Sequence, residues 1–136
     1  VRSVWNYVYR EYYHLFDYFY LGGDDVYVLV DNLRQLLAEQ MDSNIPQHLG
    51  QWLPGRDMVA GGPGYLLNKL ALQRLILEGL PNCSPTTAAS YEDRLISRCL
   101  ASLQILGNRT DTRDERGEQR FHDASPAMLY TFRAGD

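Results

Sequence analysis

Two adjacent carboxylates, Asp24 and Asp25, stand where an apolar, aromatic run ends. The run covers residues 16–21, two glycines interrupt it, and a second β-prone run at residues 26–30 follows the aspartates. Carboxylates at the carboxyl end of a strand can ligate Mg²⁺ or Mn²⁺, and such a metal can bridge to the phosphates of a ligand. The alternative is that both aspartates only form a turn, a position that they also favour.

A second acidic pair, Glu92 and Asp93, falls in the first turn of a helix that we expect to begin at Ser90. A carboxylate at that place can act as a general base. A purely structural interpretation is also available, because Ser90-x-x-Asp93 fits a capping box and acidic residues are favoured at helix N-termini. The residues alone leave both interpretations open.

His122 is the histidine that could join carboxylates around a metal, since neutral imidazole is a good Mn²⁺ ligand. A single histidine is more often not a ligand. His48 has no acidic or cysteine neighbour at ligand spacing, and we interpret it as structural.

Residues 61–64 form a glycine-rich turn, with Gly61 and Gly62 at its start. Glycine permits positive φ and a close approach of the backbone, so this turn can lie against a ligand. Its spacing is that of neither a Walker nor a Rossmann loop, and a plain tight turn is the alternative.

The elements that must position these residues alternate between helix and strand, which predicts an α/β fold. We expect a helix at residues 1–15, strands at 16–21, 47–53, 58–60 and 65–67, and loops at 80–90 and 108–136. Asp31 caps a helix that ends at Gln40, and Asn68 caps one that ends at Gly79. The first helix is expected to bury one face, made of Val4, Trp5, Val8, Tyr12 and Leu15.

The composition is that of one ordinary globular domain covering residues 1–136, with 45% hydrophobic and 22% charged residues. The net charge of −4 and the lack of a Lys/Arg cluster exclude a nucleic-acid surface. No apolar run approaches the ~20 residues of a membrane span. Because the chain opens without Met inside an expected helix, we interpret it as a partial sequence.

Four segments resemble the Fringe-like β-1,3-glycosyltransferases, glycosyltransferase family 31, in the order of that family. They are YLGGDDVYVLVDNLRQLL, AGGPGYLLNKLAL, YEDRLISRCLASL and TRDERGEQRFH. The last segment resembles the core 1 β-1,3-galactosyltransferase branch. In the acidic motif, Asp24 and Asp25 match the second and third aspartates of the family, whereas Gly23 stands in place of the first.

The resemblance implies a GT-A type nucleotide-diphospho-sugar transferase fold, of which this chain is the C-terminal portion without the N-terminal nucleotide-binding part. The implied reaction is a metal-dependent, inverting transfer of galactose from UDP-galactose to the 3-hydroxyl of O-linked GalNAc on glycoproteins. The roles carried over are Asp93 as catalytic base, Asp25 and His122 as Mn²⁺ ligands, and Asp24, Gly61, Gly62 and Glu92 as donor-binding residues.

The same resemblance implies a Golgi-luminal, type II membrane protein whose anchor lies outside this chain, and a homodimer. The expected partners are a UDP-sugar donor and a glycoprotein GalNAc-Ser/Thr acceptor. In such a compartment Cys83 and Cys99 would form a disulfide. Two glycosylation sequons, at Asn82 and Asn108, agree with a luminal location.

Two other functions stay open. One is a Fringe-like β-1,3-N-acetylglucosaminyltransferase, and the other is a non-catalytic, chaperone-like homologue of the core 1 enzyme. The acids at positions 25 and 93 and His122 favour an enzyme. Gly23 keeps the non-catalytic homologue open and predicts weakened donor binding.

Overall fold

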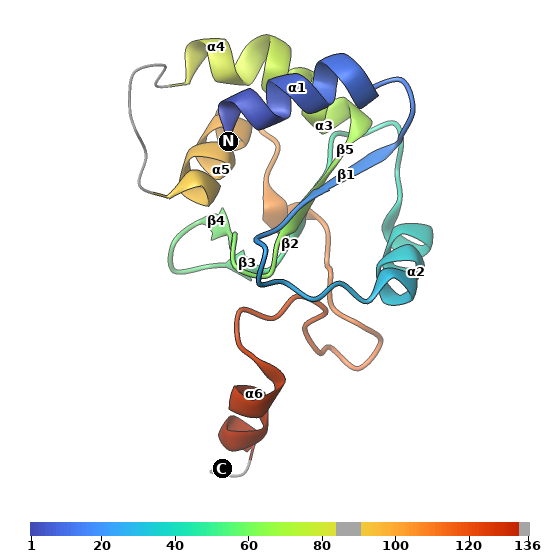
Figure 1. The fold of residues 1–136 in the computed structure, drawn as a ribbon, viewed down its shortest axis with the longest axis vertical. Helices are drawn as coiled ribbons and strands as arrows, with labels where there is room; N and C mark the ends of the chain where they lie inside the picture. The colour runs from blue at the N-terminus through green and yellow to red at the C-terminus, as the bar shows by residue number, and fades with distance from the viewer. Residues whose placement is uncertain (84–90, 134–136) are drawn as a thin grey trace.

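The computed structural model describes residues 1–83 and 91–133, which form a mixed helix-and-strand structure around a small antiparallel sheet (Figure 1). The sheet has the order β1-β5-β2, with β1 at Tyr18–Leu21, β5 at Tyr65–Asn68 and β2 at His48–Gly50. A second sheet pairs β3 (Trp52–Leu53) with β4 (Met58–Val59). The architecture agrees with the predicted α/β class, and within the described residues every strand pair is antiparallel.

Helices cover both faces of the three-stranded sheet. On one side lie α1 (Arg2–Tyr12), α3 (Lys69–Arg74), a π-helical segment (Leu75–Gly79), α4 (Leu80–Asn82) and α5 (Glu92–Ser102). On the other side lies α2 (Val30–Gln40), as Figure 1 shows. The central strand β5 sends Tyr65 and Leu67 into the first hydrophobic cluster and Leu66 into the second, as the two-residue period of a strand requires.

Two expectations about the helices after Asn68 and around Asp31 need correction. The helix after Asn68 does not end at Gly79 but continues to Asn82. Gly79 lies inside it against the Leu103 side chain, where a larger residue would be crowded. The cap itself is confirmed, since the Asn68 side chain accepts a hydrogen bond of 2.9 Å from the Ala71 N–H. In α2, Asp31 lies inside the first turn and is not the cap.

The other helical corrections concern the two ends of the chain. α1 stops at Tyr12, and of its predicted inner face Trp5 is buried, whereas Leu15 is 66% exposed. At the far end, α6 (Pro126–Arg133) lies in the segment that we expected to be loop. Two residues that are typical of a helix start stand in the sequence here. The Ser125 hydroxyl accepts a hydrogen bond from the Met128 N–H, and Pro126 is the first residue of the helix.

The structure divides one predicted strand and leaves a β-prone run outside the sheets. Residues 26–30, to which the sequence assigned no definite element, are not in a strand; Tyr27 is 87% exposed, and α2 begins at Val30. The single strand expected at residues 47–53 is divided at Gln51 between β2 and β3, which belong to different sheets. Of the loop expected at residues 80–90, residues 80–82 are helical instead, in α4. Residues 84–90, with the expected helix start at Ser90, lie outside the described residues.

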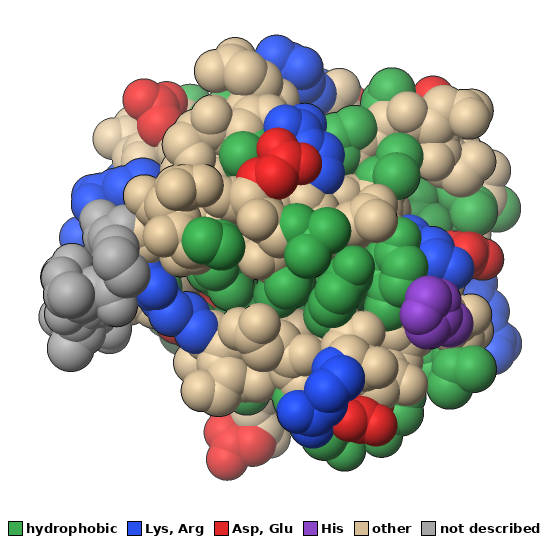
Figure 2. All heavy atoms as spheres, turned by 90° about the horizontal axis from the view of Figure 1, so that it is seen from above, with side chains coloured by type: hydrophobic (Ala, Val, Ile, Leu, Met, Phe, Trp, Pro, Cys, Tyr) green, Lys and Arg blue, Asp and Glu red, His purple; other side chains and the backbone are tan. Residues whose placement is uncertain are grey.

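Apolar side chains remain at the surface along α1 and the turn that follows it. The exposed Val4, Tyr12 and Phe16 line an open groove together with β1, and the buried Trp5 lies at its base. Figure 2, which looks onto the helical side, shows hydrophobic side chains at the surface between charged ones. Among the described residues, no helix has the length and apolar character needed to cross a lipid bilayer.

Candidate active site

The antiparallel register of β1 and β5 brings the acidic turn next to the glycine turn. Leu21, the last residue of β1, pairs with Tyr65, the first residue of β5, so the segments beyond both residues leave the sheet at the same end. The Tyr20 hydroxyl donates to the Pro63 carbonyl at 2.8 Å and joins β1 to the glycine turn. Gly64 has a φ of +75°, and the Tyr20 ring occupies the place of a Cβ there, so only glycine fits.

Asp93 lies against the glycine turn and is held from two sides. Its Oδ2 accepts a hydrogen bond of 3.0 Å from the Gly61 N–H, and its Oδ1 accepts one of 2.8 Å from the Arg94 N–H. A Cβ added to Gly61 would lie 2.9 Å from the Asp93 Cβ, so glycine permits this approach. The resemblance assigned separate roles to Asp93 and Gly61, and in the structure the two residues are in contact.

One turn further along α5, Ser97 repeats the arrangement. Its hydroxyl oxygen accepts a hydrogen bond of 3.2 Å from the Val59 N–H. Val59 and Gly61 are two residues apart, so their N–H groups point to the same edge of β4, which has its partner β3 on the other side. Asp93 and Ser97 therefore fasten α5 to that edge.

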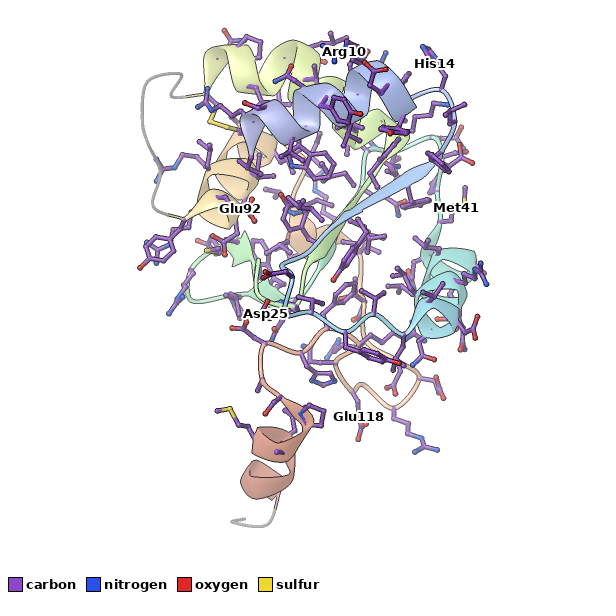
Figure 3. The ribbon with its side chains drawn as sticks, in the orientation of Figure 1. Arg10, His14, Asp25, Met41, Glu92 and Glu118 are labelled. Carbon is purple, nitrogen blue, oxygen red and sulfur yellow. A yellow bond between two sulfur atoms is a disulfide. The ribbon has the colours of Figure 1, made fainter. Side chains whose placement is uncertain are left out.

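Glu92 is partly buried beside Asp93, and its Oε2 accepts a hydrogen bond of 3.3 Å from the Tyr65 hydroxyl. Burial raises the pKa of Glu92, and the charge of Asp93 adds to this, whereas the Tyr65 hydrogen bond lowers it. Figure 3 shows Glu92 at the start of α5 and Asp25 in the turn after β1.

The expected metal ligands lie on exposed segments. Asp24 and Asp25 are exposed, and Asp25 Oδ1 folds back toward Gly23, where an added Cβ would lie 2.6 Å from it. His122 is exposed directly after the buried Phe121. The oxygen and nitrogen donors of Asp25 and His122 suit Mn²⁺ by type. No group of three or more His, Cys, Asp or Glu residues in the described ranges could hold a metal, so the two-residue ligand set stays a prediction.

Asp123 is a site residue that our sequence reasoning missed. Its carboxylate lies where a side chain on Gly62 would be, which places the segment around residue 123 beside the glycine turn. Phe121, buried with Leu36, Leu49 and Leu66, anchors that segment in the second hydrophobic cluster. Arg120 adds an ion pair of 2.8 Å to Glu39 of α2. The only sequence signal was the position next to His122.

The disulfide between Cys83 and Cys99 is present, with a Cα–Cα distance of 5.4 Å, as the sequence predicted. It joins the segment after α4 to the middle of α5, the helix that presents Glu92 and Asp93. Arg2 donates a hydrogen bond of 2.8 Å to the Cys83 carbonyl, which links α1 to the same point.

Curated relatives identify the group of proteins to which the chain is similar, although no family model matches it. It is 30% identical over 135 residues to the glycoprotein-N-acetylgalactosamine 3-beta-galactosyltransferase 1 of Xenopus laevis. It is 26% identical over 107 residues to chondroitin sulfate synthase 3 of Homo sapiens and of Mus musculus.

These matches cover most of this chain but a small part of each relative. The first covers 96% of the chain and 36% of the Xenopus protein, and the others cover 69% of the chain and 12% of the synthases. The chain thus spans about a third of the length of the galactosyltransferase. The chain is a relative of the glycosyltransferases, and its resemblance to the core 1 β-1,3-galactosyltransferase branch of the Fringe-like family is confirmed.

Proposed function

We propose that the protein is an inverting β-1,3-galactosyltransferase that moves galactose from UDP-galactose to the 3-hydroxyl of O-linked GalNAc on glycoproteins. The observation that carries the proposal is the contact between Asp93 and the Gly61 N–H. It sets a carboxylate from the start of α5 against the backbone of a turn whose glycines permit that close approach. The similarity to the Xenopus galactosyltransferase supports the choice of donor and acceptor.

In this reaction Asp93 is the general base. The acceptor hydroxyl loses its proton to the Asp93 carboxylate, its oxygen forms a bond to the anomeric carbon, and the bond from that carbon to UDP breaks with its electrons on UDP. Gly61 and Gly62 let the backbone of the turn approach the donor, and Asp24 and Glu92 accept hydrogen bonds from donor hydroxyls.

Asp25 and His122 are the residues that would hold Mn²⁺, which when bound would neutralise the charge on the departing diphosphate. A homodimer and the Golgi lumen are parts of the same proposal. The disulfide supports an oxidising compartment, because disulfides persist there.

The proposal is tested by replacing Asp93 in the full-length protein with asparagine. Asp93→Asn keeps an oxygen for the Gly61 N–H but cannot accept the acceptor's proton. We expect transfer from UDP-galactose to a GalNAc-bearing glycopeptide, measured with Mn²⁺ present, to fall about 10²- to 10⁴-fold. Binding of UDP, measured by calorimetry, should stay within about threefold of the wild type.

The matched control is Glu78→Gln, which also changes a carboxylate to an amide but on the exposed surface of the π-helical segment, where Glu78 pairs with Arg74. Transfer by this variant should equal that of the wild type. Undiminished transfer by Asp93→Asn would return Asp93 to a structural role. If the wild type transfers neither galactose nor N-acetylglucosamine, the non-catalytic homologue that Gly23 keeps open is the better interpretation.

A further inference from the structure

A chain of hydrogen bonds runs from α1 through β5 to the acidic pair of α5. The Trp5 indole N–H donates to the Tyr65 hydroxyl oxygen at 3.2 Å, and the Tyr65 hydroxyl donates to Glu92 Oε2 at 3.3 Å. An indole nitrogen only donates, so the tyrosine oxygen must accept this bond and its single proton is directed to Glu92. Trp5 therefore sets the direction of the hydroxyl group.

The middle of this chain is rigid. Trp5 and Tyr65 are each 1% exposed. The Tyr65 ring contacts Trp5 with ring centroids 6.1 Å apart and meets the buried His48 edge-on with centroids 5.3 Å apart. Burial and the nearby Glu92 raise the pKa of Tyr65, so the hydroxyl keeps the proton that it donates. The hydroxyl thus has one fixed place from which to reach Glu92.

Glu92 is the outer end of the chain. Its Oε2 is occupied by Tyr65, and no hydrogen bond within the described residues engages Oε1. The neighbouring Asp93 is held at both oxygens, with Oδ2 on the Gly61 N–H and Oδ1 on the Arg94 N–H. Glu92 is thus the carboxylate that is tied through a single oxygen, to the Tyr65 hydroxyl.

We propose that Tyr65, oriented by Trp5, is a positioning residue for Glu92, holding one carboxylate oxygen so that the other accepts a hydrogen bond from a sugar hydroxyl of the substrate. This inference rests on the proposed transferase function. Tyr65 itself does not touch the substrate. Its effect is to fix the carboxylate that does.

The hydrogen bond also affects the titration of Glu92. The titratable groups that face Glu92 are Tyr65 from β5 and Asp93 from α5. The Tyr65 hydrogen bond lowers the pKa of Glu92, whereas burial and Asp93 raise it. Removing the Tyr65 hydroxyl therefore raises the pKa of Glu92, and at a given acidic pH less of the carboxylate is ionised.

The test is Tyr65→Phe in the full-length protein, with two readouts. The first is a carbon NMR titration of ¹³C-labelled glutamate, in which the Glu92 signal is assigned by its loss in Glu92→Gln. The second is steady-state kinetics with UDP-galactose and a GalNAc glycopeptide between pH 5 and pH 8. We expect the Glu92 titration and the acidic limb of kcat/KM to move to higher pH.

The same variant should raise the KM of one sugar substrate about two- to tenfold, with kcat changed less at high pH, because one hydrogen bond that orders Glu92 is lost. Trp5→Phe should move every readout in the same direction by a smaller amount. The matched control is Tyr18→Phe on β1. It removes a hydroxyl that donates a hydrogen bond of 2.7 Å to Gln47 Oε1. It should leave the Glu92 titration and the kinetic pH profile at their wild-type values.

An unchanged Glu92 titration in Tyr65→Phe, or an active variant with the wild-type KM values and pH profile, would overturn the proposal. Thermal unfolding establishes that the variant is folded, and Trp5→Phe supplies the same readouts if Tyr65→Phe is not. A wild-type protein that transfers no sugar defeats the proposed function, and the NMR titration then decides the positioning role by itself.

Discussion

At the scale of single residues, Gly23 is the point where the chain departs from the pattern it resembles. In the structure the Asp25 carboxylate turns back toward Gly23, so an acidic side chain introduced there must displace the flexible end of Asp25. The space at position 23 is therefore available at low cost. What the position lacks is a carboxylate.

We expect Gly23→Asp to raise the affinity of the full-length protein for UDP-galactose by about one to two powers of ten, because a charged hydrogen-bond acceptor is restored. Calorimetric titration with Mn²⁺ present measures the change. Gly23→Asn is the control, since it displaces Asp25 equally without adding charge, and it should gain much less. Equal affinity of all three proteins would show that no contact is missing at this position.

The histidines show which residue roles can be recognised from the sequence. His48 was interpreted as structural from its neighbours, and it is buried under Tyr65, with burial lowering its pKa to about 3. The hydrogen bond from Tyr65 to Glu92 joins residues 27 positions apart on different elements. No local sequence pattern indicates such a pair, because the contact depends on how α1, β5 and α5 pack together.

At the scale of elements, the contact between α5 and β4 depends on two side chains, Asp93 and Ser97. Each accepts an N–H from β4 or the residues just after it, on the side that faces away from β3. We expect Ser97→Ala to lower the free energy of unfolding by about 1–3 kcal/mol, because the buried Val59 N–H loses its acceptor. Urea denaturation measures this value.

The control for that variant is Ser102→Ala on the same helix. The Ser102 hydroxyl donates to the Cys99 carbonyl at 2.7 Å, so its removal leaves no buried donor without a partner. This variant should lose at most about 0.5 kcal/mol, as is usual for substitutions away from buried networks. Equal losses in both variants would mean that the bond to β4 does not stabilise the fold.

The sequence predicted an element correctly where the signal was local. The prediction was incomplete where contacts with other elements determine the structure. The Asn68 cap and the strand around Leu66 followed from residue type and alternation. Residues 26–30 have strand propensity but no neighbouring strand among the described residues to pair with, so they stay on the surface. The division at Gln51 arises because β3 pairs with β4 and leaves the main sheet, which nothing in residues 47–53 indicates.

At the scale of the whole molecule, the disulfide closes the segment that connects the two helical parts of the first hydrophobic cluster. Cys83 and Cys99 are 16 residues apart, and a loop of that length stabilises a fold by about 3 kcal/mol in the chain-entropy estimate. We expect the double variant Cys83→Ser/Cys99→Ser to lose about that much free energy of unfolding in guanidinium melts.

Reduction offers an independent check of the same number. Dithiothreitol should lower the stability of the wild type to that of the double variant and leave the double variant unchanged. A wild type as stable after verified reduction as before it would contradict the entropic account. Transfer activity should follow the folded fraction, because α5 carries Asp93 and is held at its middle by this bond.

The contact between Asp93 and Gly61 also has a consequence for how such sequences can diverge. A side chain at position 61 would run into Asp93, and one at position 62 would run into Asp123. Gly61 is therefore tied to Asp93, whose Cβ would be met, whereas at position 62 the exposed end of Asp123 can turn away. Among related sequences, a larger residue at position 61 should occur only with a smaller one at position 93. In a lineage that lost Asp93, a larger residue could replace Gly61, and the two substitutions would be inherited together.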